Sequence, residues 1–191
     1  ELVMHLLNET ETTITATAKR LRSMGFVVSE PGSFSLRHML INDTAYAMLA
    51  PAECRQLHAE TAAYLESDAP EWTPPTETLA WHHQEAGHLE QATVFWLEAC
   101  RSAARRLAHR EAIVFAQNGL KLMAGGQIDA PKRELDLQLY LATALAAING
   151  YGAANVGEAY VRARRLNEVL GDGRANVRVL VGQWIHSWVG G

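Results

Sequence analysis

The sequence has few cysteines, no excess of positive charge and no long apolar run. Only Cys54 and Cys100 occur, far apart, so reduced thiols are expected and a disulfide framework is not. Lys and Arg number 17 against 21 Asp and Glu, a net charge of -4, which gives no electrostatic reason to expect nucleic acid or anionic lipid as a partner. No apolar stretch reaches the roughly 18 residues of a membrane-spanning helix, and no signal peptide opens the chain. We therefore expect a cytoplasmic protein without a membrane partner.

The 191 residues are 48% hydrophobic and 20% charged, which is ordinary for a protein that buries a core. This length suits one medium domain or two small ones. The chain starts at Glu1, directly before a helix-like segment, and stops at Gly190 and Gly191 after an aromatic helix. From these ends we expect a piece cut from a longer protein.

The first part of the chain predicts two helices followed by a β-hairpin. Helical periodicity covers residues 1–8 and 11–24, and Gly25 occupies the position after the second helix where a left-handed residue costs least. Two short apolar runs, 26–28 and 34–36, flank a Pro31-Gly32 turn. Helix, helix and hairpin in this order match the second half of a winged-helix domain.

The rest of the chain predicts helices and turns and no further strand. A proline-containing linker is expected at 67–75. The expected helices cover 38–49, 51–66, 76–86, 89–107, 110–123, 132–149, 156–170 and 176–189.

Residues 76–99 have the pattern of an antiparallel helix pair of the tetratricopeptide type. Gly87 marks the turn, His83 stands at the tyrosine position of that repeat, and Trp96 lies among small residues of the second helix. A strict period of about 34 residues is absent, because one such step beyond Ala92 falls on Gly126. We therefore expect helix 89–107 to be shared between two successive pairs of an α-solenoid. The small-residue positions are Ala80, Ala92 and Ala99, then Ala112, Ala116 and Gly119, then Ala159, Ala163 and Leu166.

The last expected helix has no following partner for its apolar face. Val181, Trp184, Ile185 and Trp188 share that face, which should be exposed or buried against a neighbouring molecule. Trp184 and Trp188 are therefore the candidate interaction surface, and self-association through this helix is one expectation.

Together these patterns predict an all-α fold: a tetratricopeptide-like α-solenoid preceded by a partial winged-helix domain with one β-hairpin. The expected domains are 1–49, the C-terminal part of the winged helix, and 50–191, a helical repeat region truncated at its C-terminal end.

Four segments in order carry a family resemblance. FSLRHMLINDTAY (34–46) resembles the "FRHALIxDAAY" segment of bacterial STAND-type signalling ATPases, many of which carry a class III adenylate/guanylate cyclase domain. RQLH (55–58) and AWHHQEAG (80–87) are similar to that family's "LHxxIAxxLE" and "LAxHYxxAG". GY (150–151) with VGEAY (156–160) resembles "KGYxxPEVxxAY". The chain departs from the family at Leu36 and His83, where aromatic residues are usual, and the Trp184–Trp188 region matches it only loosely.

The resemblance implies a regulatory function. The chain would be a non-catalytic region that relays binding of a protein or small-molecule signal to upstream ATPase and cyclase domains of the same chain. An alternative is the repeat region of a STAND-type transcriptional regulator whose DNA-binding domain lies outside these residues. The resemblance also implies that His38, at the start of the helix after the hairpin, touches the phosphates of bound ADP in the intact protein. The other interpretation is that His38 caps or packs a junction between domains.

Binding of a metal, of DNA or of an acidic peptide has weaker support in the sequence. His82, His83 and His88 lack the i, i+4 spacing and further ligands of a zinc site, so no metal and no cofactor is expected. Lys19, Arg20 and Arg22 on the candidate recognition helix are offset by nearby glutamates, so DNA is not the expected partner. Arginines on helix faces are expected to be solvated, and a groove for acidic peptides is the alternative: Arg101, Arg105, Arg106, Arg110, Arg162, Arg164 and Arg165.

Overall fold

The computed structural model describes the chain except for residues 1, 31–32, 68–71 and 191. The described residues form mainly α-helices and one two-stranded antiparallel sheet, so the expected all-α class with a single hairpin is confirmed at that level. They divide into two compact units. Unit 1 comprises residues 1–72 and 85–87, and unit 2 comprises 73–84 and 88–191. The predicted domain division after residue 49 stays a prediction.

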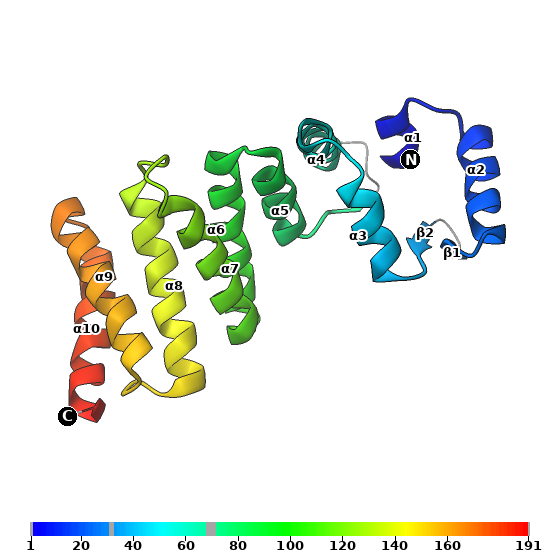
Figure 1. The fold of residues 1–191 in the computed structure, drawn as a ribbon. Coiled ribbons are helices and arrows are strands. Elements are labelled where there is room, and N and C mark those ends of the chain that lie inside the picture. The colour runs from blue at the N-terminus through cyan, green and yellow to red at the C-terminus, as the bar shows by residue number, and fades with distance from the viewer. Residues whose placement is uncertain (1, 31–32, 68–71, 191) are drawn as a thin grey trace. The chain divides into compact units, whose positions relative to one another are not determined.

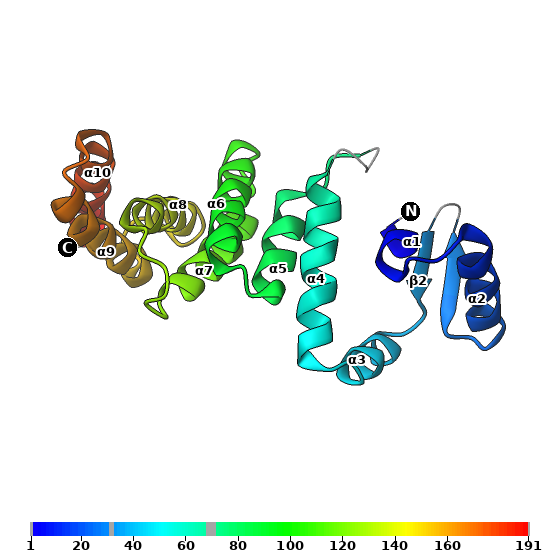
Figure 2. The same ribbon diagram turned by 90° about the horizontal axis from the view of Figure 1, so that it is seen from above.

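Unit 1 contains four helices and the hairpin, whose strands lie beside α2 (Figure 2). Thr10 begins α2 as its N-cap, where its hydroxyl accepts a hydrogen bond from the Thr13 backbone N–H, and Gly25 follows the helix with φ +81°. The hairpin pairs Val27 with Leu36, while the predicted Pro31-Gly32 turn lies outside the described residues. The elements are α1 (Leu2–Leu7), α2 (Glu11–Ser23), β1 (Val27–Glu30), β2 (Ser33–Leu36), α3 (Met39–Ala47) and α4 (Pro51–Glu66).

Unit 2 is a row of helices, and α6 to α10 lie side by side in chain order (Figure 1). Helix α6 packs on α7 and α8 and shares a core cluster with α5. The assignment of these helices to the pairs of a solenoid stays a prediction. It ends before the predicted Leu107, which adopts a left-handed φ of +56°. The elements are α5 (Thr76–Ala86), α6 (Leu89–Arg105), α7 (His109–Met123), α8 (Pro131–Asn149), α9 (Ala154–Leu170) and α10 (Gly173–Gly190).

Small residues let the helices of unit 2 approach closely. Ala80, Ala92 and Ala99 are fully buried in one cluster with Trp96, as the sequence predicts. At Gly119 an added methyl group would lie 2.9 Å from the Leu137 side chain, so a larger residue there would force Leu137 to shift. The core continues from α7 to α10 around Leu135, Leu139, Val156, Tyr160 and Val179.

Candidate functional site

Trp184 and Trp188, the predicted interaction surface, are exposed on α10. Trp184 is 66% exposed and Trp188 is 78% exposed. Their four-residue spacing places them on one helix face, and the two indole rings stack in parallel with centroids 6.2 Å apart. They form a flat aromatic platform of the kind that protein interfaces use as an anchor.

The platform is part of a larger apolar surface. The opposite side of α10 is buried through Ala175, Val179 and Gly182. Exposed apolar side chains gathered on one helix face are a feature of interaction surfaces. We call this set the α10 surface: Val177, Leu180, Val181, Trp184 and Trp188.

A groove of about 690 Å³ lies between α9 and α10, with Trp184 among its lining residues. Glu158 and Arg164 line its α9 side, and Arg164 forms an ion pair with Glu168 at 2.9 Å. His186 also lines it, and its Nδ1 donates a hydrogen bond of 2.6 Å to the Tyr151 carbonyl oxygen. Because a carbonyl can only accept, this bond fixes the proton of His186 on Nδ1. The groove is therefore lined by the Trp184 ring and by the polar side chains of Glu158, Arg164 and His186.

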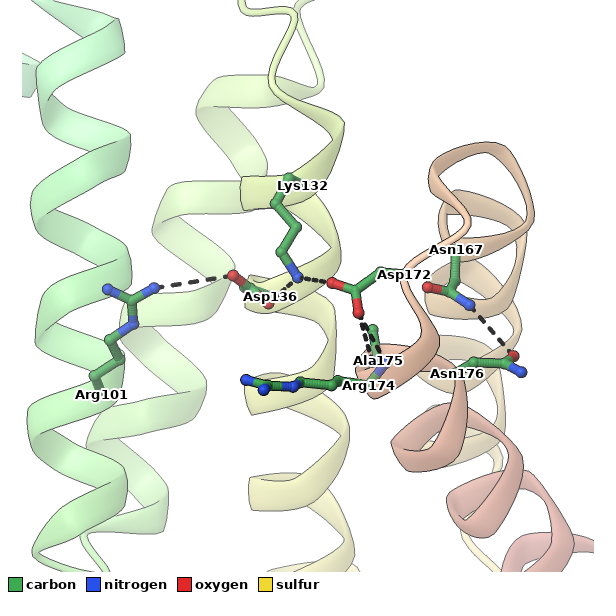
Figure 3. A network of polar contacts seen from close by, with 8 residues as sticks. All are labelled: Arg101, Lys132, Asp136, Asn167, Asp172, Arg174, Ala175 and Asn176. Carbon is green, nitrogen blue, oxygen red and sulfur yellow. Dashed lines mark hydrogen bonds and ion pairs between the residues drawn. The ribbon is translucent and has the colours of Figure 1, made fainter.

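A polar network links α8 to the start of α10 (Figure 3). Lys132 Nζ lies 2.6 Å from Asp172 Oδ2 and 3.3 Å from Asp136 Oδ1, and Arg101 approaches Asp136 at 3.9 Å. Asp172 Oδ1 accepts the backbone N–H groups of Arg174 and Ala175. Each of the two carboxylates therefore has a cationic partner, and the Lys132–Asp172 pair joins α8 to the residue before α10.

The pKa of the Asp172 carboxyl lies well below its usual value, at about 2. The main cause is the hydrogen bond from Lys132, followed by the backbone N–H of Ala175 at the helix start. This cap also explains why α10 begins at Gly173, earlier than the expected residue 176. Nearby, Asn167 Nδ2 donates to Asn176 Oδ1 at 3.3 Å.

His38 occupies the N-cap position of α3 in unit 1. Its backbone is extended, with φ -135° and ψ 137°, and its side chain is exposed and makes no capping hydrogen bond. The described residues next to it are Arg37 and the exposed Met39 and Leu40.

The three histidines of the 82–88 segment do not converge on one point. His83 is buried and its ring stacks on Phe95 at 5.1 Å, so the expectation that it packs between helices is confirmed. Its Nδ1 lies 3.4 Å from Nδ1 of the exposed His88. In the described part of the chain, no group of three or more His, Cys, Asp or Glu side chains is placed to hold a metal ion.

Most of the arginines that could line an acidic-peptide groove are paired within the chain. Arg162 donates two hydrogen bonds to Glu134, at 2.8 and 2.9 Å, and Arg106 lies 3.0 Å from Glu111. Arg101 and Arg105 both approach Glu98. These pairs support the interpretation of solvated helix faces, because little positive charge is left over for a partner.

Unit 1 has its own open apolar hollow, of about 490 Å³, lined by residues of α2, the hairpin and α3. Met48 and Leu40 at its edge are largely exposed. Its lining residues are Leu21, Phe26, Val27, Leu36, Leu40, Ile41, Thr44, Ala45 and Met48.

Sequence reasoning missed Asp172 and Lys132. The Gly-Asp-Gly run before α10 carries the signal of an Asp cap, but Lys132 is forty residues from Asp172 and has no local signal.

None of the helices in the described ranges is long and apolar enough to cross a bilayer. Comparisons of the chain with protein-family models, with curated proteins and with solved structures found no match.

Proposed function

We propose that this chain is a non-catalytic regulatory and protein-interaction region of a multidomain signalling ATPase. In this proposal, binding of a ligand or partner to the helical repeats is relayed to upstream ATPase and nucleotide cyclase domains in the cytoplasm. The observation that carries the proposal is the α10 surface, where Trp184 and Trp188 present stacked, exposed rings on a helix whose other side is firmly packed.

The finer fold assignment is part of the proposal. Helix α2, the hairpin and α3 follow the order of the second half of a winged-helix domain. Helices α5 to α10 would form a tetratricopeptide-like solenoid, supported by the buried small residues that recur along them, such as Ala92, Ala116 and Ala163. In such a stack each helix contacts its neighbours, so a change at one end can pass along packed helices.

The test uses the intact protein with Trp184→Ala and Trp188→Ala combined. Its ATP turnover, and cyclase activity where that domain is present, are measured with and without a cell extract that stimulates the wild type. We expect the stimulation to fall by about fivefold or more, the lower range of allosteric coupling. Trp72→Ala is the matched control, because the Trp72 indole is 57% exposed and does not belong to the α10 surface. Unchanged stimulation in the double variant would refute the proposed role of the surface.

His38 is proposed as a nucleotide contact of the intact protein. The support is its place at the N-cap of α3 with a side chain free of capping bonds. His38→Ala should lower the amount of ADP that co-purifies with the intact protein, measured by chromatography of the released nucleotide. His109→Ala, at the start of α7, is the control. Equal ADP retention in the wild type and the His38 variant would leave only a junction role.

A further inference from the structure

A second, smaller pocket of about 280 Å³ lies among α8, α10 and the beginning of α9. Its size is just below the roughly 300–1,000 Å³ of most small-molecule sites, so a ligand here must be small. Its lining residues are Leu139, Thr143, Tyr151, Tyr160, Val177, Arg178, Val181, Gly182 and Ile185. We call it the Arg178 pocket.

The pocket has one charge. Arg178 is the charged residue among its lining groups, and its guanidinium carbon lies 5.7 Å from the centroid of the Tyr140 ring. This cation–π contact holds the side chain over an aromatic face without using its N–H groups. Within the described ranges, no carboxylate lies at ion-pair distance from Arg178, in contrast to Arg162 and Arg164.

The remaining walls are apolar or carry neutral hydroxyl groups. Leu139, Val181 and Ile185 offer aliphatic surface, and Tyr160 is almost fully buried under Gly182. Burial raises the pKa of the Tyr160 phenol, so the group stays protonated and adds no charge. Thr143 donates its hydroxyl proton to the Leu139 carbonyl at 2.8 Å. Arg178, which is exposed, is therefore the source of charge among the lining residues.

We propose that the Arg178 pocket binds a small monocarboxylate with an apolar body. A planar guanidinium matches a carboxylate through paired N–H···O bonds, and the aliphatic walls would take the hydrocarbon part. A phosphate fits less well, because the lining residues include a single cation and the start of α10 is already occupied by the Asp172 carboxylate.

Ligand binding here would tie α10 to α8. Val177 and Val181 belong to both the pocket and the α10 surface, so an occupied pocket would fix the helix that carries Trp184 and Trp188. This effect of ligand binding on α10 deepens the proposed function and rests on it. Binding of the carboxylate to the pocket does not depend on the proposed function.

The experiment titrates the full chain with benzoate and butyrate, with benzamide as the neutral isostere and inorganic phosphate as the other anion. Binding is followed by calorimetry and by the methyl NMR signals of Val181 and Ile185. We expect benzoate to bind with a dissociation constant of about 1 mM or tighter, within the range for a ligand of this size. Arg178→Gln should weaken it by about tenfold or more, the cost of losing a charge-assisted hydrogen bond. Arg178→Lys, which keeps the charge, should bind benzoate more weakly than the wild type and more tightly than Arg178→Gln.

Arg174→Gln is the matched control, since Arg174 lies on the same helix and does not line the pocket. Each variant is first checked for wild-type circular dichroism and melting temperature. Equal binding of benzamide and benzoate, equal binding by Arg178→Gln, or tighter binding of phosphate would each overturn the assignment. If benzoate binds but the α10 surface variant of the intact protein keeps its stimulation, the proposed function fails and the pocket stands. If that variant loses its stimulation but benzoate does not bind to the chain, the pocket assignment fails and the proposed function stands.

Discussion

Gly182 of α10 lies under the ring of Tyr160, and an added methyl group would sit 2.2 Å from the ring carbon Cε1. Tyr160 belongs to the core cluster, so its ring must shift within packed surroundings to make room for the methyl group. Gly182→Ala should therefore lower the free energy of unfolding by about 1–3 kcal/mol, although alanine favours a helix. Chemical denaturation followed by circular dichroism measures the change.

The control for this substitution is Gly173→Ala at the first residue of α10, where an added methyl group meets no atom within 4 Å. We expect this variant to keep the wild-type stability or to gain slightly. A Gly182→Ala protein as stable as Gly173→Ala would contradict the close approach of α9 and α10.

Asp172 should make stability depend on pH in the acidic range. Its pKa is about 2 in the folded chain against an ordinary value of 3.8, so the unfolded chain takes up the proton first as pH falls. The stabilisation by this carboxylate is complete above the ordinary pKa and is lost as pH falls through about 2. Asp172→Asn should thus have a lower urea midpoint than the wild type at pH 6, and the difference should shrink toward pH 2.

The amide of Asn can still cap α10, so the difference at pH 6 reports the ion pair with Lys132. Asp129→Asn, an exposed site, is the control and should follow the wild type at both pH values. A midpoint difference that is the same at pH 6 and pH 2 would show that the Lys132–Asp172 pair does not act in this way.

Among the elements, α10 carries two exposed indoles on one side, while Ala175, Val179 and Gly182 on its other side are buried. Replacing Trp184 or Trp188 by alanine should change the free energy of unfolding by less than about 0.5 kcal/mol, since surface substitutions cost little. Trp96→Ala should cost about 3–5 kcal/mol, because this indole is 5% exposed, stacks on Phe115 and donates to Gln84. Urea unfolding of the three single variants gives the comparison.

Iodide quenching of fluorescence provides an independent check on the same residues. Loss of Trp184 and Trp188 should lower the quenchable emission, because iodide reaches exposed indoles, and the exposed Trp72 and Trp81 account for the quenchable emission that stays. A large stability loss in either α10 variant would mean that these rings pack within the chain and do not form a free surface.

At the scale of the whole molecule, the two units differ in the core that they bury. The hydrophobic clusters found in the described residues all belong to unit 2, where Leu135, Leu137 and Leu139 of α8 are fully buried. Helix α3 of unit 1 has no buried residue. Native-state hydrogen exchange should therefore be slower for α8 amides than for α3 amides by about a hundredfold or more, after correction for intrinsic rates.

Mass spectrometry of peptic peptides can measure both helices in one sample, with α4 as an internal reference because it buries His58, Thr61, Ala62 and Leu65. Its amides should exchange at an intermediate rate. Equal protection of α3 and α8 would argue that one cooperative core extends through both units.

The sequence by itself determined where helices form, because that choice depends on neighbours along the chain. Pro51 and Gly87 set helix ends locally, and α4 and α5 have the bounds that the pattern predicts. The recurring alanines, such as Ala92 and Ala116, identified the faces that pack. The exposed pair Trp184 and Trp188 could be predicted for the same reason, since helical spacing alone places both on one face.

Only the tertiary structure decided which distant side chains meet. Lys132 reaches Asp172 across forty residues, and the Arg178 pocket takes its walls from three helices. It also grouped α4 with the N-terminal unit, where α1 packs on it and the His5 and Tyr64 rings lie 5.1 Å apart. Periodicity specifies a face and not a partner, and the pairing of faces depends on how side-chain volumes fit once the helices pack.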